Sequence, residues 1–444
     1  MTRAARAALA GAAALFTSGC GFFVPDYVHT EWRDAVTTSV PARPEQPREM
    51  VGLALSGGGT RAAVFAATAI EELDRLGIAE KVTHISSVSG GAFAATYHVT
   101  TPPPDCATSQ CRADHFATFR ETMRSNLGGA TFRRQLTNPG RFTSPTRRSV
   151  SLKESLDAAF LEGATFGDLP RSPALLINAA RYTDGRRFVF SNLALPDEAY
   201  DHRFLSQPAL RAASFSRPGC PRPAPDAMPL SFAVAASASF PLFFGPVTLE
   251  APVDCAGTST EYWHFGDGGV IENLGTETLR EIVLRAALEG RPFKRVTILS
   301  MDGEQLHTPA EMLQQADVGI WTSNPGIVVD TTKTRARAYA ELIWERIARE
   351  LGVEIKIVRM RYTDSQLTEW PESCAVESRS GVSILAHLKQ IATGLSISDC
   401  DADLMEAAAR DLVRRNFSVV ALVANEEVPS NTRMRIRTEL LMNQ

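Results

Sequence analysis

The chain has 444 residues and a mass of 48.2 kDa, with 44% hydrophobic and 22% charged residues. These values are ordinary for a globular protein and exclude a disordered chain or a long coiled coil. The formal net charge of −4 argues against a protein that binds nucleic acid through a general basic field. No uninterrupted apolar run reaches the roughly 18 residues that a membrane span requires.

Residues 1–19 have the pattern of a secretory signal peptide: a basic start, an apolar run and small residues before Cys20. The sequence Thr-Ser-Gly-Cys at 17–20 resembles a bacterial lipobox, although Thr17 stands where leucine is usual. We therefore expect export, with Cys20 lipidated as an anchor in the cell envelope. Gly21 resembles the residue found in lipoproteins released to the outer membrane. The alternative is a plain signal peptide with a chance cysteine.

Residues 20–50 are polar and contain several prolines, which is typical of an extended tether. The body then alternates strand and helix patterns, and this β-α-β-α order predicts an α/β protein with a parallel sheet covered by helices. Strands are predicted at 51–56, 82–88, 174–180, 187–191, 296–301 and 354–361. Helices are predicted at 60–76, 90–99, 310–316, 335–351, 383–391 and 403–415.

A glycine-rich loop, Ser-Gly-Gly-Gly-Thr-Arg at 56–61, joins the first strand to the first helix. Consecutive glycines let backbone N–H groups turn toward an anion, and the helix N-terminus adds a positive partial charge. Such a loop can hold a phosphate or the oxyanion of acyl transfer. A nucleotide site is not supported, because no Lys-Ser/Thr pair follows and the Gly-x-Gly-x-x-Gly pattern ends in Ala62.

Ser89 lies in the sequence Ser-Val-Ser-Gly-Gly at 87–91, where the second strand gives way to the second helix. This is the setting of a nucleophile elbow, in which a strained turn exposes a serine hydroxyl. Ser87 replaces the first glycine of the usual Gly-x-Ser-x-Gly. The N–H of Gly90 follows the nucleophile and can contribute to an oxyanion hole. A serine at a helix N-cap is the simpler interpretation.

Asp267 is surrounded by glycines in Phe-Gly-Asp-Gly-Gly at 265–269. Taken with the glycine loop and the serine elbow, in this order, the sequence resembles the patatin-like phospholipase family. The segment Ala-Ala-Ser-Ala-Ser-Phe-Pro-Leu-Phe-Phe at 235–244 resembles a further family feature. The resemblance implies a three-layer patatin-like domain at 51–305, with the central, mostly parallel sheet flanked by helices. Residues 306–444 would form a mainly helical α/β extension packed on it.

The resemblance also implies catalysis by a Ser89–Asp267 dyad without histidine. Ser89 would attack an ester carbonyl, and Asp267 would accept its proton and later activate water. Arg61 would fix the glycine loop. No metal or organic cofactor is implied, and the expected partners are phospholipids and a membrane surface. The amides expected to hold the oxyanion are those of Gly57, Gly58, Gly59 and Gly90.

Several alternatives remain. An α/β-hydrolase would need a histidine such as His307 or His387, although Ser89 follows an unusually early strand for that fold. His264, close to Asp267 in sequence, is interpreted as structural. A catalytically silent lipid-binding lipoprotein and a lipid transacylase are compatible with the same residues. The aromatic run at 240–244 is either an acyl-binding or interfacial patch or, as we expect, ordinary core packing after a strand.

Six cysteines follow Cys20, an even number that suggests disulfides in an exported chain. No spacing typical of a zinc site occurs. Sequence proximity favours three pairs, although six cysteines allow 15 pairings. The favoured pairs are Cys106–Cys111, Cys220–Cys255 and Cys374–Cys400.

Overall fold

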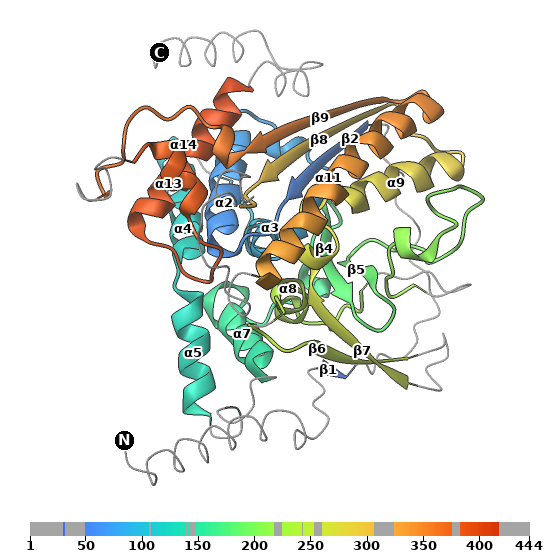
Figure 1. Ribbon diagram of the computed structural model, residues 1–444, viewed down its shortest axis with the longest axis horizontal. Coiled ribbons are helices and arrows are strands. Elements are labelled where there is room, and N and C mark those ends of the chain that lie inside the picture. Colours follow the sequence, from blue (N-terminus) through green and yellow to red (C-terminus); the bar gives the residue numbers. More distant parts are fainter. Residues whose placement is uncertain are drawn as a thin grey trace.

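The computed structural model describes residues 30–31, 49–105, 108–138, 141, 147–216, 224–241, 243–252, 260–305, 324–374 and 382–416. They form a nine-stranded sheet between two layers of helices (Figure 1). The strands are β1 (Thr30–Glu31), β2 (Glu49–Leu55), β3 (His84–Val88), β4 (Ala174–Arg181), β5 (Arg186–Ser191), β6 (Val247–Pro252), β7 (Thr260–Asp267), β8 (Arg295–Asp302) and β9 (Glu354–Arg361).

The α-helices are α2 (Gly59–Arg75), α3 (Gly90–Thr100), α4 (Ser109–Arg124), α5 (Leu127–Thr137), α7 (Arg148–Leu156), α8 (Leu230–Ala238), α9 (Thr276–Leu288), α11 (Asn324–Leu351), α13 (Ile384–Gln390) and α14 (Asp399–Arg415). No helix among these is long and apolar enough to cross a membrane, within the residues that the structure describes.

The sheet is parallel at its centre and antiparallel at one end. Strands β4, β3, β2, β8 and β9 are parallel neighbours in this order, while β5 and β7 both run antiparallel to β4. The predicted mostly parallel sheet is therefore confirmed. The antiparallel strands β6 and β7 and the helices α4, α5, α7, α8 and α9 were not predicted. Helix α8 is buried on all sides and so has no amphipathic period that would reveal it.

Strand β2 shows how the layers are filled. Val51, Leu53 and Leu55 face the core beneath α2, α3 and α8, whereas Met50 and Ala54 face the core beneath α9 and α11. Alternate side chains of a strand point to opposite faces. A strand that is covered on both faces therefore reads as the continuous apolar run seen in the sequence.

The C-terminal part continues the same sheet. Strand β9, at the predicted position, pairs in parallel with β8, and α14 packs on α2. Glu72 of α2 is 3.3 Å from Arg414 of α14 and is almost fully buried. Glu406 of α14 likewise binds Arg120 and Arg124 of α4. Buried carboxylates with charged partners thus fix the C-terminal helix to the helices beside the glycine loop.

Candidate active site

The strand register explains why Ser89 and Asp267 meet. Val88, the last residue of β3, pairs with Asn178 of β4, and Asp267, the last residue of β7, pairs with Ala179. Because residues 179–181 pair with β5 as well as β7, β7 must occupy the same edge of β4 as β3. The two strands therefore approach each other head-on along one edge, and their C-terminal ends come together.

Ser89 occupies a strained turn between β3 and α3. Its φ of 50° and ψ of −121° are rare for a residue other than glycine. A Cβ on Gly90 would lie 2.0 Å from the carbonyl oxygen of Gly59, and one on Gly91 would lie 2.5 Å from that of Leu55. The helix can thus approach the glycine loop closely only because both residues lack a side chain. The elbow geometry predicted from the sequence is present.

The Ser89 hydroxyl donates a hydrogen bond of 2.8 Å to Oδ2 of Asp267. The other carboxylate oxygen, Oδ1, accepts the N–H of Gly269 at 2.7 Å, and the Asp267 N–H donates to the carbonyl of Ser239 at 3.0 Å. Ser89 is 8% exposed and Asp267 is 4% exposed. The carboxylate is therefore oriented within a largely buried site, with one oxygen directed at the serine hydroxyl.

Ser237 is a positioning residue that the sequence analysis did not single out. Its hydroxyl accepts the N–H of Ser89 at 2.8 Å and donates to the carbonyl of Asn178 at 2.6 Å. It lies in the Ala-Ser segment that carried part of the family resemblance, which is the signal that could have identified it. This hydroxyl connects α8 to the elbow and to β4.

The glycine loop lies directly against the elbow. A Cβ on Gly57 would be 3.2 Å from Cβ of Ser89, but the Gly57 N–H donates to the carbonyl of Asn273 at 3.0 Å. Gly57 therefore contributes proximity, and its amide is already engaged. Gly58 caps α2, while Gly59 and Gly90 are the first residues of α2 and α3. The first N–H groups of a helix have no partner within it, so these three amides are the candidates for an oxyanion hole.

Arg61, the last residue of the glycine loop, is almost fully buried. Its guanidinium donates to the carbonyl of Gly303 at 3.0 Å, to Oγ1 of Thr393 at 3.0 Å and to the carbonyl of Ile391. Burial lowers the pKa of Arg61, an effect that the negative charge of Glu304 and Asp302 opposes, and an arginine remains charged under such conditions. The side chain thus fixes the loop through contacts within the fold.

Residues 391–395, which we call the strap, complete the loop from the C-terminal part of the chain. The carbonyl of Gly394 accepts the N–H of Thr60 at 2.8 Å, and that of Leu395 accepts the N–H of Gly128 at 2.8 Å. A Cβ on Gly59 would lie 2.0 Å from the Gly394 carbonyl oxygen. The strap thus packs on the backbone that presents the candidate oxyanion amides.

The histidines considered from the sequence have other partners. His264 is exposed on β7, and its Nδ1 is 3.0 Å from Oγ1 of Thr248. Nε2 of His387 lies 2.7 Å from Oδ1 of Asp401 in the C-terminal region, and His307 lies outside the described residues. Ser89 contacts Asp267 directly, so the described part of the chain supports a dyad. Tyr182 lies nearby: burial, and secondarily the charge of Asp267, raises its pKa.

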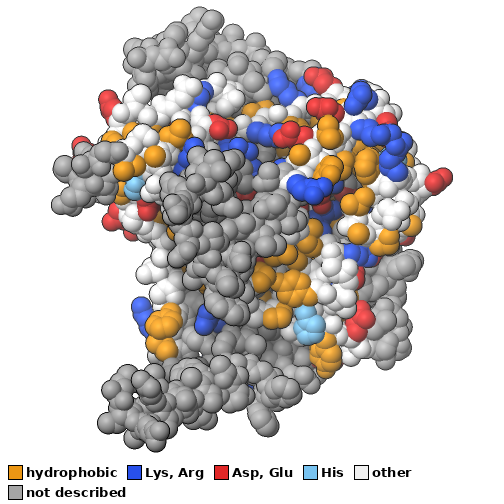
Figure 2. All heavy atoms as spheres, in the orientation of Figure 1, with side chains coloured by type: hydrophobic (Ala, Val, Ile, Leu, Met, Phe, Trp, Pro, Cys, Tyr) orange, Lys and Arg blue, Asp and Glu red, His pale blue; other side chains and the backbone are white. Residues whose placement is uncertain are grey.

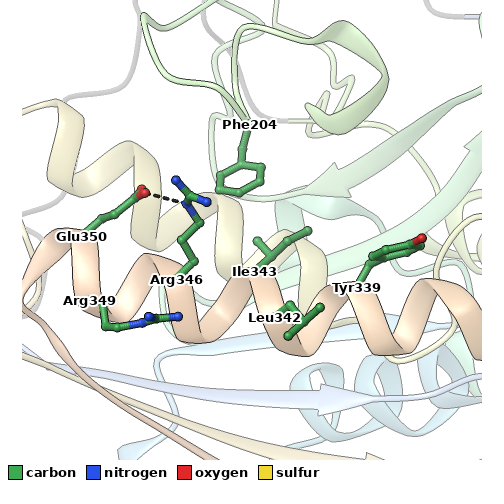
Figure 3. A pocket seen from close by; sticks show the side chains of 7 residues that line it. All are labelled: Phe204, Tyr339, Leu342, Ile343, Arg346, Arg349 and Glu350. Atoms are coloured by element: carbon green, nitrogen blue, oxygen red, sulfur yellow. Dashed lines mark hydrogen bonds and ion pairs between the residues drawn. The ribbon is translucent and has the colours of Figure 1, made fainter.

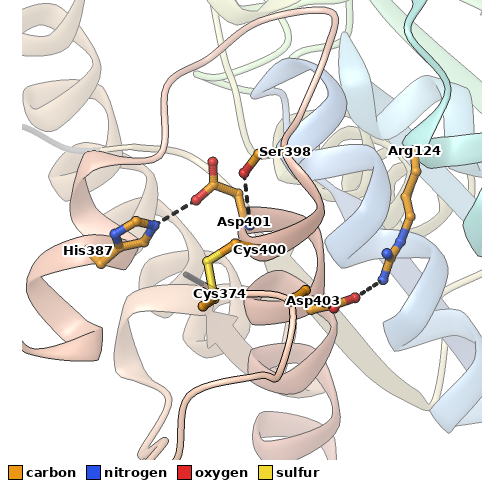
Figure 4. Close-up of a disulfide and its surroundings, with 8 residues drawn as sticks. Arg124, Cys374, His387, Ser398, Cys400, Asp401 and Asp403 are labelled. Carbon is orange, nitrogen blue, oxygen red and sulfur yellow. Dashed lines mark hydrogen bonds and ion pairs between the residues drawn. A yellow bond between two sulfur atoms is a disulfide. The ribbon is translucent and has the colours of Figure 1, made fainter. Parts of the chain in front are cut away.

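The C-terminal region also contains the disulfide predicted between Cys374 and Cys400 (Figure 4). His387, Cys400 and Asp401 bring donor atoms within 4.8 Å of one another, but the Cys400 sulfur is bonded to Cys374 and is not a thiolate ligand. Cys111 is disulfide-bonded, while Cys106, Cys220 and Cys255 lie outside the described residues. The other two predicted pairs therefore stay predictions.

A separate hollow lies beside α11 and is shown in Figure 3. Its lining includes Phe204, Leu342 and Arg346, and Ile343 and Phe204 pack near Ile355 at the start of β9. Strands β3, β2, β8 and β9 run parallel, so all of them start on one side of the sheet and finish on the other. The start of β9 and the C-terminal end of β3 therefore lie at opposite ends of the strands. The hollow is therefore not part of the Ser89 site.

The model of the patatin-like phospholipase family matches residues 53–280, about half of the chain. The chain belongs to this family, and lipid ester hydrolysis is the activity class that the family indicates. No curated protein matches the sequence.

The fold comparison returns human GIVD cytosolic phospholipase A2, with 12% identity and a TM-score of 0.46 over 84% of this chain and 60% of that one. A complex of the same enzyme with methyl gamma-linolenyl fluorophosphonate gives 14% identity and a TM-score of 0.43, over 85% and 58%. VipD from Legionella pneumophila gives 11% identity and a TM-score of 0.29, over 85% and 69%. The chain thus spans about 60% of the length of the human structures.

Proposed function

We propose that the protein is a serine lipid acyl hydrolase that cleaves carboxylic esters of membrane lipids through Ser89 and Asp267, in the manner of a phospholipase A or lysophospholipase. The observation that carries this proposal is the 2.8 Å hydrogen bond from the Ser89 hydroxyl to Oδ2 of Asp267. Ser89 is the residue immediately before α3, and the N-terminus of this helix stabilises the negative charge that develops on the substrate oxygen. Family membership supports the lipid ester substrate class.

The reaction begins when the Ser89 oxygen attacks the ester carbonyl while its proton passes to Asp267. The tetrahedral oxyanion accepts hydrogen bonds from the amides of Gly58, Gly59 and Gly90. Collapse of this intermediate breaks the ester bond, and Asp267 returns the proton to the departing alcohol. The acyl group is then on Ser89. A water molecule, deprotonated by Asp267, attacks it, and Asp267 passes this proton to the Ser89 oxygen as the bond to the acyl group breaks and the fatty acid is released.

The setting we propose for this reaction is the bacterial cell envelope. The basic and apolar start of the chain and the Thr-Ser-Gly-Cys sequence at 17–20 support export and lipidation of Cys20. A lipid at that position would hold the enzyme at a phospholipid surface by its tether. Metabolic labelling with a palmitate analogue should depend on Cys20. A secreted product with an intact Cys20 thiol would contradict this part of the proposal.

The experiment that tests the activity uses a short-chain nitrophenyl ester and a fluorophosphonate probe. The parent should hydrolyse the ester and be labelled once, and Ser89→Ala should lose both properties. A parent without turnover or labelling would indicate the lipid-binding alternative, and labelling that survives in Ser89→Ala would refute the nucleophile. Incubation with mixed envelope lipids, with products identified by mass spectrometry, then separates hydrolysis from acyl transfer to another alcohol.

A further inference from the structure

One stretch of the sequence is strongly basic. Between residues 122 and 153 the sequence contains Arg124, Arg133, Arg134, Arg141, Arg147, Arg148 and Lys153 and no aspartate or glutamate. This stretch includes α5 and the start of α7. A net charge of −4 for the whole chain therefore conceals a basic stretch along α5 and the start of α7. Within it, Arg124 pairs with Asp403 and Glu406, and Arg134 and Arg141 pair with Glu154.

The same region exposes large apolar side chains. Phe132 and Leu136 of α5 are 64% and 45% exposed, and Phe243, in the turn after α8, is 62% exposed. The expectation that residues 240–244 form ordinary core packing after a strand is wrong for Phe243, which follows a helix and faces solvent. Figure 2 shows hydrophobic and basic side chains side by side over α5, which projects from the body in Figure 1.

Two hydrogen bonds bring these residues to one end of the α5–α7 pair. Oγ of Ser151 in α7 donates to Oε1 of Gln135 in α5 at 3.0 Å. The Arg148 guanidinium donates to the carbonyl of Phe243 at 2.9 Å. The exposed apolar residues of α5 and the turn after α8 are therefore linked through the first turn of α7. We call Phe132, Leu136 and Phe243, with Arg133, Arg134 and Arg148, the α5 face.

The α5 face is linked to the candidate active site at two points. At its start, α5 joins the strap through the N–H of Gly128 and the carbonyl of Leu395. At the other side, Phe243 lies four residues after Ser239, whose carbonyl binds the N–H of Asp267. A bilayer that covers the α5 face would therefore lie next to the strap and to the turn whose Ser239 carbonyl binds Asp267.

We propose that the α5 face docks the enzyme onto anionic phospholipid bilayers, with Phe132, Leu136 and Phe243 entering the interface and the arginines contacting lipid phosphates. The proposal rests on the proposed lipid hydrolase function. A basic segment gains electrostatic free energy at an anionic bilayer, and apolar side chains gain by leaving water there. Binding to a polyanion such as nucleic acid would use the arginines but leave the three apolar side chains in water.

The route of the chain agrees with this orientation. Thr30 pairs with Leu249 of β6, six residues after Phe243. Cys20 precedes Thr30 by ten residues, and a chain of that length spans at most about 35 Å. A lipid on Cys20 would therefore lie within about 35 Å of Thr30, which pairs with the strand that follows the turn carrying Phe243.

The test measures sedimentation of the full chain with vesicles of phosphatidylcholine alone or mixed with phosphatidylglycerol, in a Cys20→Ser background that removes the proposed anchor. Replacing Phe132, Leu136 and Phe243 by serine should weaken binding to the mixed vesicles by about tenfold or more. The pair Arg133→Gln and Arg134→Gln should weaken it by about fivefold per charge, with little effect on neutral vesicles. The matched control replaces Tyr339 and Leu342 of α11, which are 55% and 61% exposed, by serine.

Hydrolysis of a soluble nitrophenyl ester separates this proposal from the proposed function. The α5-face variants should keep the parent's rate on the soluble ester and lose rate on vesicle lipid. Vesicle binding can also be measured if the parent hydrolyses no ester at all, in which case only the proposed function fails. Unchanged vesicle binding, an equal loss in the α11 control, or a change of oligomeric state in place of vesicle binding would overturn the docking proposal.

Discussion

Replacing Asp267 by asparagine should abolish catalysis while preserving the fold. Asparagine keeps Oδ1, which can still accept the Gly269 N–H that is now 2.7 Å away. The group that replaces Oδ2 is an NH₂ donor, so it cannot accept the Ser89 proton across the present 2.8 Å contact. The substitution therefore removes the base and leaves the volume nearly unchanged.

The expected loss is of order 10⁴ in kcat, because the nucleophile and its base act as a unit. A factor of that size corresponds to about 5.5 kcal/mol of transition-state stabilisation. The KM for a short soluble ester should change little, since Asp267 is directed at the serine. The assay is steady-state hydrolysis of a nitrophenyl ester, with the melting temperature measured in parallel to show that the variant is folded.

Two histidine variants provide the matched controls. His264→Gln alters an exposed side chain that is bonded to Thr248, and His387→Gln alters the pair with Asp401. Both should retain most of the activity. A folded Asp267→Asn protein with substantial activity, beside an inactive histidine variant, would refute the dyad and return the protein to a Ser-His-Asp mechanism.

Three further predictions concern the surroundings of the site. Gly59→Ala would place a Cβ 2.0 Å from the Gly394 carbonyl and should lower kcat by about 10²–10³ through displaced oxyanion amides; Gly77→Ala, also at positive φ, should cost stability without that loss, and equal activities would contradict the role of the strap. Burial raises the pKa of Glu272 from 4.5 to about 7. The folded state therefore holds this proton more tightly than the unfolded state, and the resulting contribution to the free energy of unfolding is complete below about pH 4.5 and is lost as the pH rises through 7. In urea titrations Glu272→Gln should therefore gain stability relative to the parent between pH 5 and 8, by up to about 3 kcal/mol, and a constant difference would refute this. Replacing Cys374 and Cys400, which are 26 residues apart, by serine should lower the free energy of unfolding by about 3.5 kcal/mol; an unchanged denaturation midpoint would exclude a stabilising role for this disulfide.

The features that the sequence predicted well are local. The serine elbow and the glycine loop each lie within a few residues of a strand end and a helix start, and only small residues permit those turns. Strand β9 was predicted from the alternation of apolar and charged residues at 354–361. The Cys374–Cys400 pair was favoured by proximity along the chain. The family resemblance then supplied Asp267, because short motifs in a fixed order are more specific together than alone.

Only the tertiary structure decided how distant segments meet. The head-on approach of β3 and β7 along β4, which brings Ser89 to Asp267, depends on strand pairing across 178 residues. The engagement of the Gly57 amide by Asn273 and the packing of the strap on Gly59 have no counterpart in any local pattern. The exposure of Phe243 likewise depends on what packs around it. Hydrogen-bond partners and burial are properties of the assembled fold, since each depends on neighbours that sequence spacing does not specify.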